Sequence, residues 1–366
     1  MHVAEIAPPW FPIPPQAYGG IERVVYDVTE GLVAAGQAVT LFAPAGSRTR
    51  GRLIETGSAG VGLDHDEEAK HDHFLRNGRQ AYAQAAILDA DLVHDHTDFT
   101  PDPDFPLPIV RTIHGPAADP HVAMYVAMSA RGDRFLAISE RQRALFLTAA
   151  RALFGPGEHL RFVGVVHNPI DIAATPFYPA TAKEEYVAFV GRCHWEKGPV
   201  GAIQVALETG VPLKLALRVT DQERPYFEAA VRPALREAGR LAEFVGEVGG
   251  AAKADLIGRA RAVIFSSPWE EPFGLVLTEA GAHGTPVVAL RRGAAPEIVA
   301  EGVNGYLAAD LKGLAQVLPA AMALDPAVCR ASVATRFDRP VIAHQLVTIF
   351  AAVLAETGAA RHLTAV

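Results

Sequence analysis

Short apolar runs alternate along the chain with segments in which apolar residues recur at helical spacing. This alternation is typical of α/β folds, in which helices cover parallel sheets. The clearest helix follows the first run: apolar residues recur every three or four positions from Ile21 to Val33, and Gly36 stands where a C-terminal cap belongs. The strands predicted in the first half are residues 3–6, 39–42, 92–94, 109–113, 135–138 and 162–166.

The second half of the chain restarts the same alternation. Between the halves, residues 168–183 are rich in Pro, Ala and Thr and lack periodicity, which predicts an interdomain linker. The chain has 366 residues, enough for two domains of ordinary size. We therefore predict one domain in residues 1–170, a second in residues 171–345 and a C-terminal helix in residues 346–366. The strands predicted in the second half are residues 186–190, 213–217, 242–245, 262–265 and 286–290.

Charge and composition exclude several classes of partner. The formal net charge is −8 and no polybasic segment occurs, so we expect neither nucleic acid nor an anionic membrane surface as a partner. We expect no integral membrane segment, because the chain has no run of about 18 uncharged apolar residues. Cys193 and Cys329 are far apart and form no disulfide framework, which fits a reducing compartment. Together these features predict a cytoplasmic protein.

Two carboxylates stand eight residues apart across a predicted strand-to-helix turn. Glu271 follows the strand at residues 262–265, and Glu279 lies on a helix predicted at residues 275–283. In open α/β sheets, ligands bind beyond the carboxyl ends of the strands. Carboxylates accept hydrogen bonds from the vicinal hydroxyls of a sugar or a ribose. The alternative is a solvated Glu pair near a helix N-terminus, where the helix dipole favours it.

Candidate anion-binding groups lie near the same predicted edge of the second sheet. Backbone amides at Phe273, Gly274 and Leu275 begin the helix and would point towards an anion. Arg192 and Lys197 follow the first predicted strand of the second domain, so both could reach a pyrophosphate. The alternative for this pair is an ordinary surface arginine and lysine.

A glycine pair, Gly19 and Gly20, precedes the first predicted helix. Two glycines let a ligand approach the backbone closely, and the helix start offers free N–H groups. Such a pair before a helix is also common in plain turns. Its position after the first predicted strand favours a binding loop.

Taken together, these motifs resemble retaining glycosyltransferases of family 4, which have the GT-B fold: two Rossmann-like, doubly wound α/β domains that face each other across a cleft. The similarity runs in the family's order through residues 1–310. The motifs that carry it are Y-G-G-I-E at 18–22, G-R-C-H-W-E-K-G at 191–198, Glu271-x7-Glu279, G-T-P-V-V-A at 284–289 and P-E-I-V at 296–299.

The resemblance implies roles for individual residues. It implies that Glu279 binds the ribose hydroxyls, that Glu271 approaches the donor sugar, and that Arg192 and Lys197 hold the diphosphate. His114 is similar to a family histidine near the donor sugar. Front-face attack, in which the leaving phosphate takes the acceptor proton, is the usual explanation of retention in the family, and a double displacement through a carboxylate stays open. The C-terminal helix is expected to cross back to the first domain.

In this fold the N-terminal domain binds the acceptor. Tyr18, His94 and His96 are therefore candidates for acceptor contacts, although His94 and His96 could equally be polar loop residues that cap the next segment. No metal site is predicted, because Asp102-Pro-Asp104 has D-x-D spacing but lies in a proline-rich loop. The histidine-rich residues 64–73 are expected to form a solvated loop.

The function predicted from the sequence is that of a retaining, metal-independent glycosyltransferase without a cofactor. It would move a hexose from a nucleotide diphosphate sugar, with UDP-sugar the family-level expectation, to a soluble hydroxyl acceptor: a small molecule, a glycan or a natural product. Two alternatives stay open. One is a sugar phosphorylase or nucleotide-sugar epimerase on the same fold, and the other is a non-catalytic nucleotide-sugar-binding protein.

Overall fold

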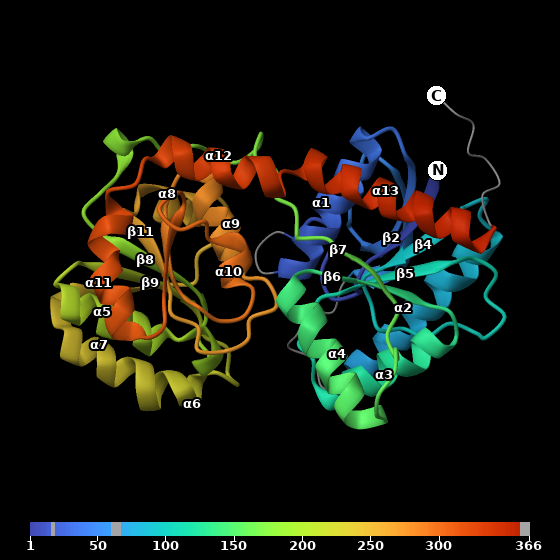
Figure 1. Ribbon diagram of the computed structural model, residues 1–366, viewed down its shortest axis with the longest axis horizontal. Helices are drawn as coiled ribbons and strands as arrows, with labels where there is room; N and C mark the ends of the chain where they lie inside the picture. Colours follow the sequence, from blue (N-terminus) through green and yellow to red (C-terminus); the bar gives the residue numbers. More distant parts are fainter. Residues whose placement is uncertain (16–18, 60–66, 359–366) are drawn as a thin grey trace. The chain divides into compact units, whose positions relative to one another are not determined.

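The computed structural model describes residues 1–15, 19–59 and 67–358. The chain divides into two compact units, each built on one parallel sheet (Figure 1). Unit 1 comprises Met1–Pro169 and Arg339–Val366, and unit 2 comprises Ile170–Asp338. The predicted α/β class with two Rossmann-like domains is confirmed.

The sheet of unit 1 has seven strands in the order β3-β2-β1-β4-β5-β6-β7. The order reverses between β1 and β4, which makes their carboxyl ends the topological switch point. Strand β3 was not predicted, because it is an edge strand whose charged and small residues interrupt any apolar run. The strands are β1 (His2–Ile6), β2 (Ala38–Ala45), β3 (Arg52–Ala59), β4 (Leu92–Asp95), β5 (Ile109–Ile113), β6 (Arg134–Ala137) and β7 (Phe162–Val165).

Helices cover both faces of the first sheet (Figure 1). The helices α1 (Gly20–Ala34) and α13 (Arg339–Thr357) pack together on one face. Three others, α2 (Glu67–Ile87), α3 (Asp119–Ala130) and α4 (Glu140–Phe154), bury their apolar residues against the other face. The prediction of a loop at residues 64–73 is wrong from Glu67 onwards, because α2 begins there. Residues 64–66 lie outside the described residues.

The last helix begins earlier than predicted. Residues 339–345 were assigned to the second domain, but α13 starts at Arg339 and is part of unit 1 throughout its length. The reason is its contacts with α1: the Arg339 guanidinium donates to Asp27 at 2.6 Å, and Ala343 lies against Gly31.

The part of the chain that the structure describes contains one helix, α13, long and apolar enough to cross a membrane by length and composition. The bent pair α11 (Leu311–Met322) and α12 (Pro326–Phe337) passes the same test when taken together. The sequence predicted no membrane-spanning segment because the chain has no long run of uncharged apolar residues, whereas α13 contains charged residues at its ends. In this fold α13 buries Leu346, Phe350 and Leu354 against unit 1.

The sheet of unit 2 has six strands in the order β10-β9-β8-β11-β12-β13, so its switch point lies between β8 and β11. The short strand β13 was not predicted. Helices α5, α7 and α11 pack on one face, and α8 and α9 lie on the other with α12 against α9. The strands are β8 (Val187–Arg192), β9 (Leu213–Arg218), β10 (Ala242–Gly246), β11 (Ala262–Phe265), β12 (Val287–Leu290) and β13 (Gly305–Ala308), and the remaining helices named here are α5 (Pro199–Thr209), α7 (Arg232–Ala238), α8 (Gly250–Arg259) and α9 (Leu275–Ala282).

The segment predicted as an interdomain linker, residues 168–183, is mostly part of unit 2. Arg330 on α12 donates to the backbone carbonyls of Ile172, at 2.6 Å, and Thr175, at 3.0 Å. Lys183 donates at 2.7 Å to the carbonyl of Gly258. These bonds fix an irregular segment that lacks helical or strand periodicity, which is why its sequence resembles a linker.

Candidate functional site

The switch point of unit 2 brings two predicted residues into contact. Strands β8 and β11 are hydrogen-bonded neighbours, and the loops that follow them carry Lys197 and Glu271. The Lys197 Nζ lies 2.5 Å from Glu271 Oε2, with 19% and 13% of the side chains exposed. The sequence predicted separate ligand groups for them, a phosphate for Lys197 and a sugar for Glu271. In the structure the two side chains are in direct contact with each other.

Glu279 also has a lysine partner, which the sequence motifs did not reveal. The Lys253 Nζ on α8 donates to the Glu279 carboxylate at 2.7 Å, and both side chains are about one-third exposed, at 32% and 28%. Glu279 lies on α9, which begins at Leu275 as predicted, after Gly274 at φ 90°. We call Lys197, Glu271, Lys253 and Glu279 the lysine–glutamate site.

Two serines at the end of β11 tie the two loops together. Ser266 Oγ donates to the carbonyl of Gly198 at 2.7 Å, and Ser267 Oγ donates to the carbonyl of Glu196 at 2.5 Å. Gly198 has φ +74°, and a Cβ there would come within 2.2 Å of the Ser266 carbonyl oxygen. The loop after β8 therefore needs glycine at this position.

A second close approach supports the Glu271 backbone. Gly293, in the loop after β12, has φ +54°, and a Cβ there would lie 2.4 Å from the Glu271 carbonyl oxygen. The next amide, Ala294 N–H, donates to that oxygen at 2.9 Å. Gly293 was missed from the sequence because nothing in its neighbours indicates which loop it touches.

Arg192 is the last residue of β8 and belongs to the same edge of the sheet. Its guanidinium nitrogens lie 3.6 Å from a Glu223 carboxylate oxygen and 3.7 Å from one of Glu196, and the side chain is 36% exposed. At these distances the contacts are loose. Phe273 is buried, with its ring against Phe337. The predicted residues of the second domain thus gather at the carboxyl ends of β8 and β11.

The glycine loop of unit 1 precedes α1. Gly19 has φ 148°, a Cβ there would meet Pro15 at 2.7 Å, and α1 begins at Gly20. Tyr18 lies outside the described residues. Glu22, in the first turn of α1, is buried, and burial raises the pKa of its carboxyl to about 7.

At the switch point of unit 1, Glu5, His94, His96 and His114 form what we call the histidine group. Glu5 and His94 are register partners on β1 and β4, and their side chains have no exposed surface. Glu5 Oε1 lies 2.5 Å from His96 Nε2, while His94 Nδ1 lies 2.9 Å from that oxygen without forming a hydrogen bond. His96 Nδ1 is 2.8 Å from His114 Nε2.

Burial places limits on the predicted roles of the histidine group. His94 and His96 were predicted as acceptor contacts, but both rings are buried, and Phe350 of α13 packs against His94 with the ring centroids 5.0 Å apart. Contact with an acceptor would require neighbouring side chains to move. His114 is partly exposed at the end of β5. It is therefore the member that a ligand can reach.

The charges of the histidine group follow from its surroundings. Burial by itself raises the pKa of Glu5, but His94 and His96 outweigh it and lower that pKa to about 2. Burial, followed by the nearby His96 and His94, lowers the pKa of His114 well below its usual value. Burial and His94 also lower the pKa of His96. At neutral pH the group is thus a carboxylate beside neutral His96 and His114.

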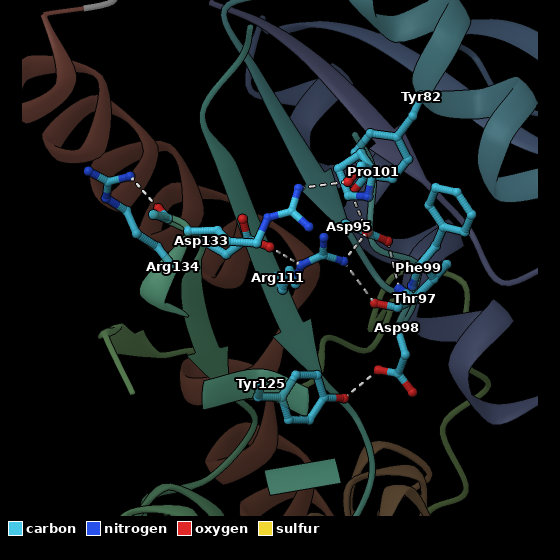
Figure 2. Close-up of polar contacts among 12 residues, drawn as sticks. Tyr82, Asp95, Thr97, Asp98, Phe99, Pro101, Arg111, Tyr125, Asp133 and Arg134 are labelled. Carbon is cyan, nitrogen blue, oxygen red and sulfur yellow. Dashed lines mark hydrogen bonds and ion pairs between the residues drawn. The ribbon is translucent and has the colours of Figure 1, made fainter. Parts of the chain in front are cut away.

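The opposite face of the same sheet carries a separate buried polar cluster (Figure 2). Arg111 on β5 binds the carboxylates of Asp95 and, at 2.6 Å, Asp133, and Tyr82 Oη donates to Asp95 at 2.5 Å. Arg111 is 1% exposed. Side chains alternate between the two faces along a strand, so His94 and Asp95 enter different clusters.

Comparison with known proteins settles the family. Residues 175–318 match the family described as Glycosyl transferases group 1, and residues 18–174 match Glycosyltransferase Family 4. The chain belongs to glycosyltransferase family 4. A glycogen synthase of Mycobacterium tuberculosis is 28% identical, with 93% of this chain and 92% of that protein covered. A phosphatidyl-myo-inositol mannosyltransferase of Mycolicibacterium smegmatis is 25% identical, with 96% and 93% covered.

Solved structures agree with this assignment and establish the GT-B fold. AviGT4, a glycosyltransferase involved in avilamycin A biosynthesis, aligns with a TM-score of 0.69 at 25% identity and covers 97% of this chain and 98% of its own. Anabaena HepE, solved in complex with UDP and glucose, aligns with a TM-score of 0.71 at 19% identity and covers 96% of this chain and all of its own.

One group of side chains in this glycosyltransferase has the composition of a metal site. Within the described residues, ligand atoms of Glu5, His94 and His96 lie within 4.8 Å of one another. The 2.5 Å separation of Glu5 Oε1 and His96 Nε2 is a hydrogen-bond distance. Ligands about 2.0–2.2 Å from a tetrahedral zinc ion lie roughly 3.4 Å apart, so these atoms would have to separate. The prediction of no metal site stays a prediction.

Proposed function

We propose that this glycosyltransferase moves a hexose from a nucleotide diphosphate sugar, a UDP-sugar, to a soluble hydroxyl acceptor, with retention of configuration and without a metal ion. The observation that carries the proposal is the lysine–glutamate site at the carboxyl ends of β8 and β11. Lys197, with Arg192 at the end of β8, matches the anionic diphosphate of the donor, and the two carboxylates match the hydroxyls of its two sugars.

The cations would act on the leaving group. As the bond from the anomeric carbon to the diphosphate oxygen breaks, the electron pair goes to that oxygen, the acceptor oxygen forms the new bond to carbon, and the acceptor's hydroxyl proton passes to the leaving diphosphate. Lys197, together with Arg192 at the end of β8, would stabilise the charge that grows on the diphosphate more in the transition state than in the ground state. In the structure Lys197 Nζ lies 2.5 Å from Glu271 Oε2. Binding of the diphosphate would therefore require only the Lys197 side chain to move part of its contact from Glu271 to a phosphate oxygen.

The carboxylates would bind hydroxyls. Glu279 is assigned to the ribose and Glu271 to the donor sugar, in line with the family resemblance. Lys253 orients Glu279 from α8, so it is a further residue for which we propose a supporting role. The choice of UDP is supported by the HepE structure, which contains UDP and glucose.

The remaining elements of the proposal come from unit 1. His114 would contact the donor sugar, and the glycine loop at Gly19 and Gly20 would approach the diphosphate. The acceptor is a small molecule, a glycan or a natural product. We propose a cytoplasmic location, which the two free cysteines, Cys193 and Cys329, support.

The experiment that tests the proposal is a turnover assay with a panel of nucleotide sugars: UDP-glucose, UDP-galactose, GDP-mannose and ADP-glucose, each with a set of hydroxyl acceptors. We expect acceptor-dependent release of UDP from one UDP-hexose, undiminished by a chelator, and proton NMR should show the donor's anomeric configuration in the product. Turnover of a nucleotide sugar alone would favour an epimerase, and turnover that needs inorganic phosphate a phosphorylase. Binding of a nucleotide sugar without turnover of any kind would favour the non-catalytic alternative.

A further inference from the structure

The histidine group contains a chain of hydrogen bonds that leads from a buried carboxylate to a partly exposed histidine ring. It runs from Glu5 Oε1 to His96 Nε2, at 2.5 Å, and from His96 Nδ1 to His114 Nε2, at 2.8 Å. Each contact has one donor and one acceptor. The protonation of the first member therefore determines the donors and acceptors of the others.

The donor and the acceptor of each hydrogen bond in this chain follow from its buried end. Glu5 is a carboxylate and can only accept, so His96 Nε2 must carry a proton. His96 is neutral, so its Nδ1 has a lone pair and accepts from His114 Nε2–H. His114 is also neutral, so its own Nδ1 carries a lone pair. Within the described residues no protein donor contacts that Nδ1.

We propose that Glu5, acting through His96, is a positioning residue that holds His114 in the Nε2–H tautomer, so that His114 presents only a hydrogen-bond acceptor to the ligand. The inference rests on the proposed function in one respect, the contact of His114 with the donor sugar. An acceptor at this atom selects a ligand group that can donate, which is a neutral sugar hydroxyl. It rejects a phosphate or carboxylate oxygen, because two acceptors would then face each other.

The rest of the histidine group explains why the carboxylate is held in place. Glu5 is fully buried, and the ring of Phe350 on α13 packs against His94 with the centroids 5.0 Å apart. His94 Nε2 pairs with Thr112 Oγ1 at 2.8 Å, away from His114. Glu5 Oε2 has no partner within the described residues, so Oε1 forms the carboxylate's hydrogen bond in this group. The tautomer of His114 thus depends on Glu5 and His96, not on Thr112.

The test is nitrogen-15 NMR of protein labelled at histidine, with His114 assigned by its loss in His114→Gln. In the wild type without ligand, we expect His114 protonated at Nε2 and bare at Nδ1. In Glu5→Gln, the amide can donate to His96 Nε2 and reverse both rings, so a Nδ1-protonated population of His114 should appear. Thr112→Val is the matched control, since it removes the hydroxyl that pairs with His94 on the same face of the sheet and should leave the His114 tautomer unchanged.

Binding and kinetics supply the functional readout. Glu5→Gln should lower kcat/KM for the UDP-hexose on the order of tenfold to a hundredfold, which corresponds to one misdirected hydrogen bond. It should leave the Kd of UDP within about twofold of the wild type, because UDP lacks the sugar that His114 would contact. Thr112→Val should change neither quantity comparably.

Three results would overturn the proposal: His114 protonated at Nδ1 in the wild type, an unchanged tautomer in Glu5→Gln, or one equivalent of zinc in the purified protein that Glu5→Gln loses. The wild-type spectrum needs no variant, so a Glu5→Gln protein that does not fold leaves the test intact. Failure of the proposed function is distinguishable, because the wild type then shows no acceptor-dependent release of UDP from a UDP-hexose, whereas the tautomer can still be measured.

Discussion

The two sheets share the strand order 3-2-1-4-5-6, yet their switch points differ in chemistry. At the switch point of unit 1 the side chains of Glu5, His94 and His96 are buried, and the Glu5 carboxylate is hydrogen-bonded to His96. At β8 and β11 of unit 2 the polar side chains are charged, partly exposed and paired as lysine with glutamate. The same topology therefore carries two kinds of polar group: partly exposed ion pairs in unit 2 and a buried hydrogen-bonded network in unit 1.

The helices account for this difference. In unit 1, α13 comes from the far end of the chain and covers the face that carries the histidine group, with Phe350 against His94. In unit 2 the loops after β8 and β12 approach neighbouring backbone closely at Gly198 and Gly293, and the two lysine–glutamate pairs stay partly exposed. Burial favours fixed hydrogen bonds, and exposure favours exchange with a ligand.

The largest expected effect separates structural from functional charge. Arg111→Ala would leave the buried carboxylates Asp95 and Asp133 without their cation, so we expect a loss of about 3–5 kcal/mol in the free energy of unfolding of unit 1. Chemical denaturation should show it. Arg291→Ala is the control, because its pair with Glu301 is about half exposed and should be worth less than about 1 kcal/mol. Equal effects of the two variants would contradict the contrast between buried and exposed charge.

The second prediction concerns activity without stability. Lys197→Ala should lower kcat/KM about 100- to 1,000-fold through lost stabilisation of the leaving diphosphate, while thermal stability stays close to that of the wild type. Steady-state kinetics and a melting curve measure the two quantities. Lys214→Ala, on β9 of the same unit, should leave kcat/KM unchanged. A small kinetic effect at Lys197 would remove the main reason to assign the leaving group to unit 2.

The third prediction uses the raised pKa of Glu22. Its folded pKa, about 7, exceeds the usual 4.5, so the folded state holds the proton more tightly than the unfolded state. Stability from this group is therefore full below about pH 4.5 and is lost as the pH rises through about 7, by on the order of 3 kcal/mol in total. Glu22→Gln should raise the melting temperature by several degrees at pH 8 and hardly at pH 4.5. An equal gain at both pH values would show that the carboxyl does not titrate in this range.

The smallest expected effect tests the loop contact in unit 2. Gly293→Ala forces a Cβ against the Glu271 backbone at positive φ, which should cost about 1–2 kcal/mol in stability and weaken donor binding more than Gly210→Ala does. Gly210 also has positive φ, at 69°, but a Cβ there meets nothing within 4 Å. Calorimetry with UDP-hexose and UDP compares the two variants. Equal donor binding in both would mean that Gly293 does not position Glu271.

Local patterns predicted most of the fold, and long-range contacts account for what they missed. Apolar runs located most of the strands because parallel strands are buried on both faces. The edge strand β3 and the four-residue β13 lack such a run, and α13 could not be placed at Arg339 because its partner, Asp27, is 312 residues away.

The same reasoning applies to the candidate sites. Glu271 and Lys197 belong to sequence motifs, so the sequence predicted them as site residues. It did not predict that their side chains contact each other. Lys253 stands 26 residues before Glu279 and belongs to none of the motifs, so no pattern in the sequence pairs the two residues. Glu5 lies in a predicted buried strand, and only the pairing of β1 with β4 reveals that it faces His94.

The measurement that tests the account most directly is titration calorimetry of UDP and UDP-hexose against the wild type, Lys197→Ala and Glu279→Gln, with Glu301→Gln as the matched surface control. The account predicts that the wild type and Glu301→Gln bind UDP alike, that both site variants lose at least about tenfold in affinity, and that all four proteins remain folded. UDP binding that is the same in all four proteins would contradict the assignment of the donor to the lysine–glutamate site. Failure of the wild type to bind any nucleotide would contradict the proposed function itself.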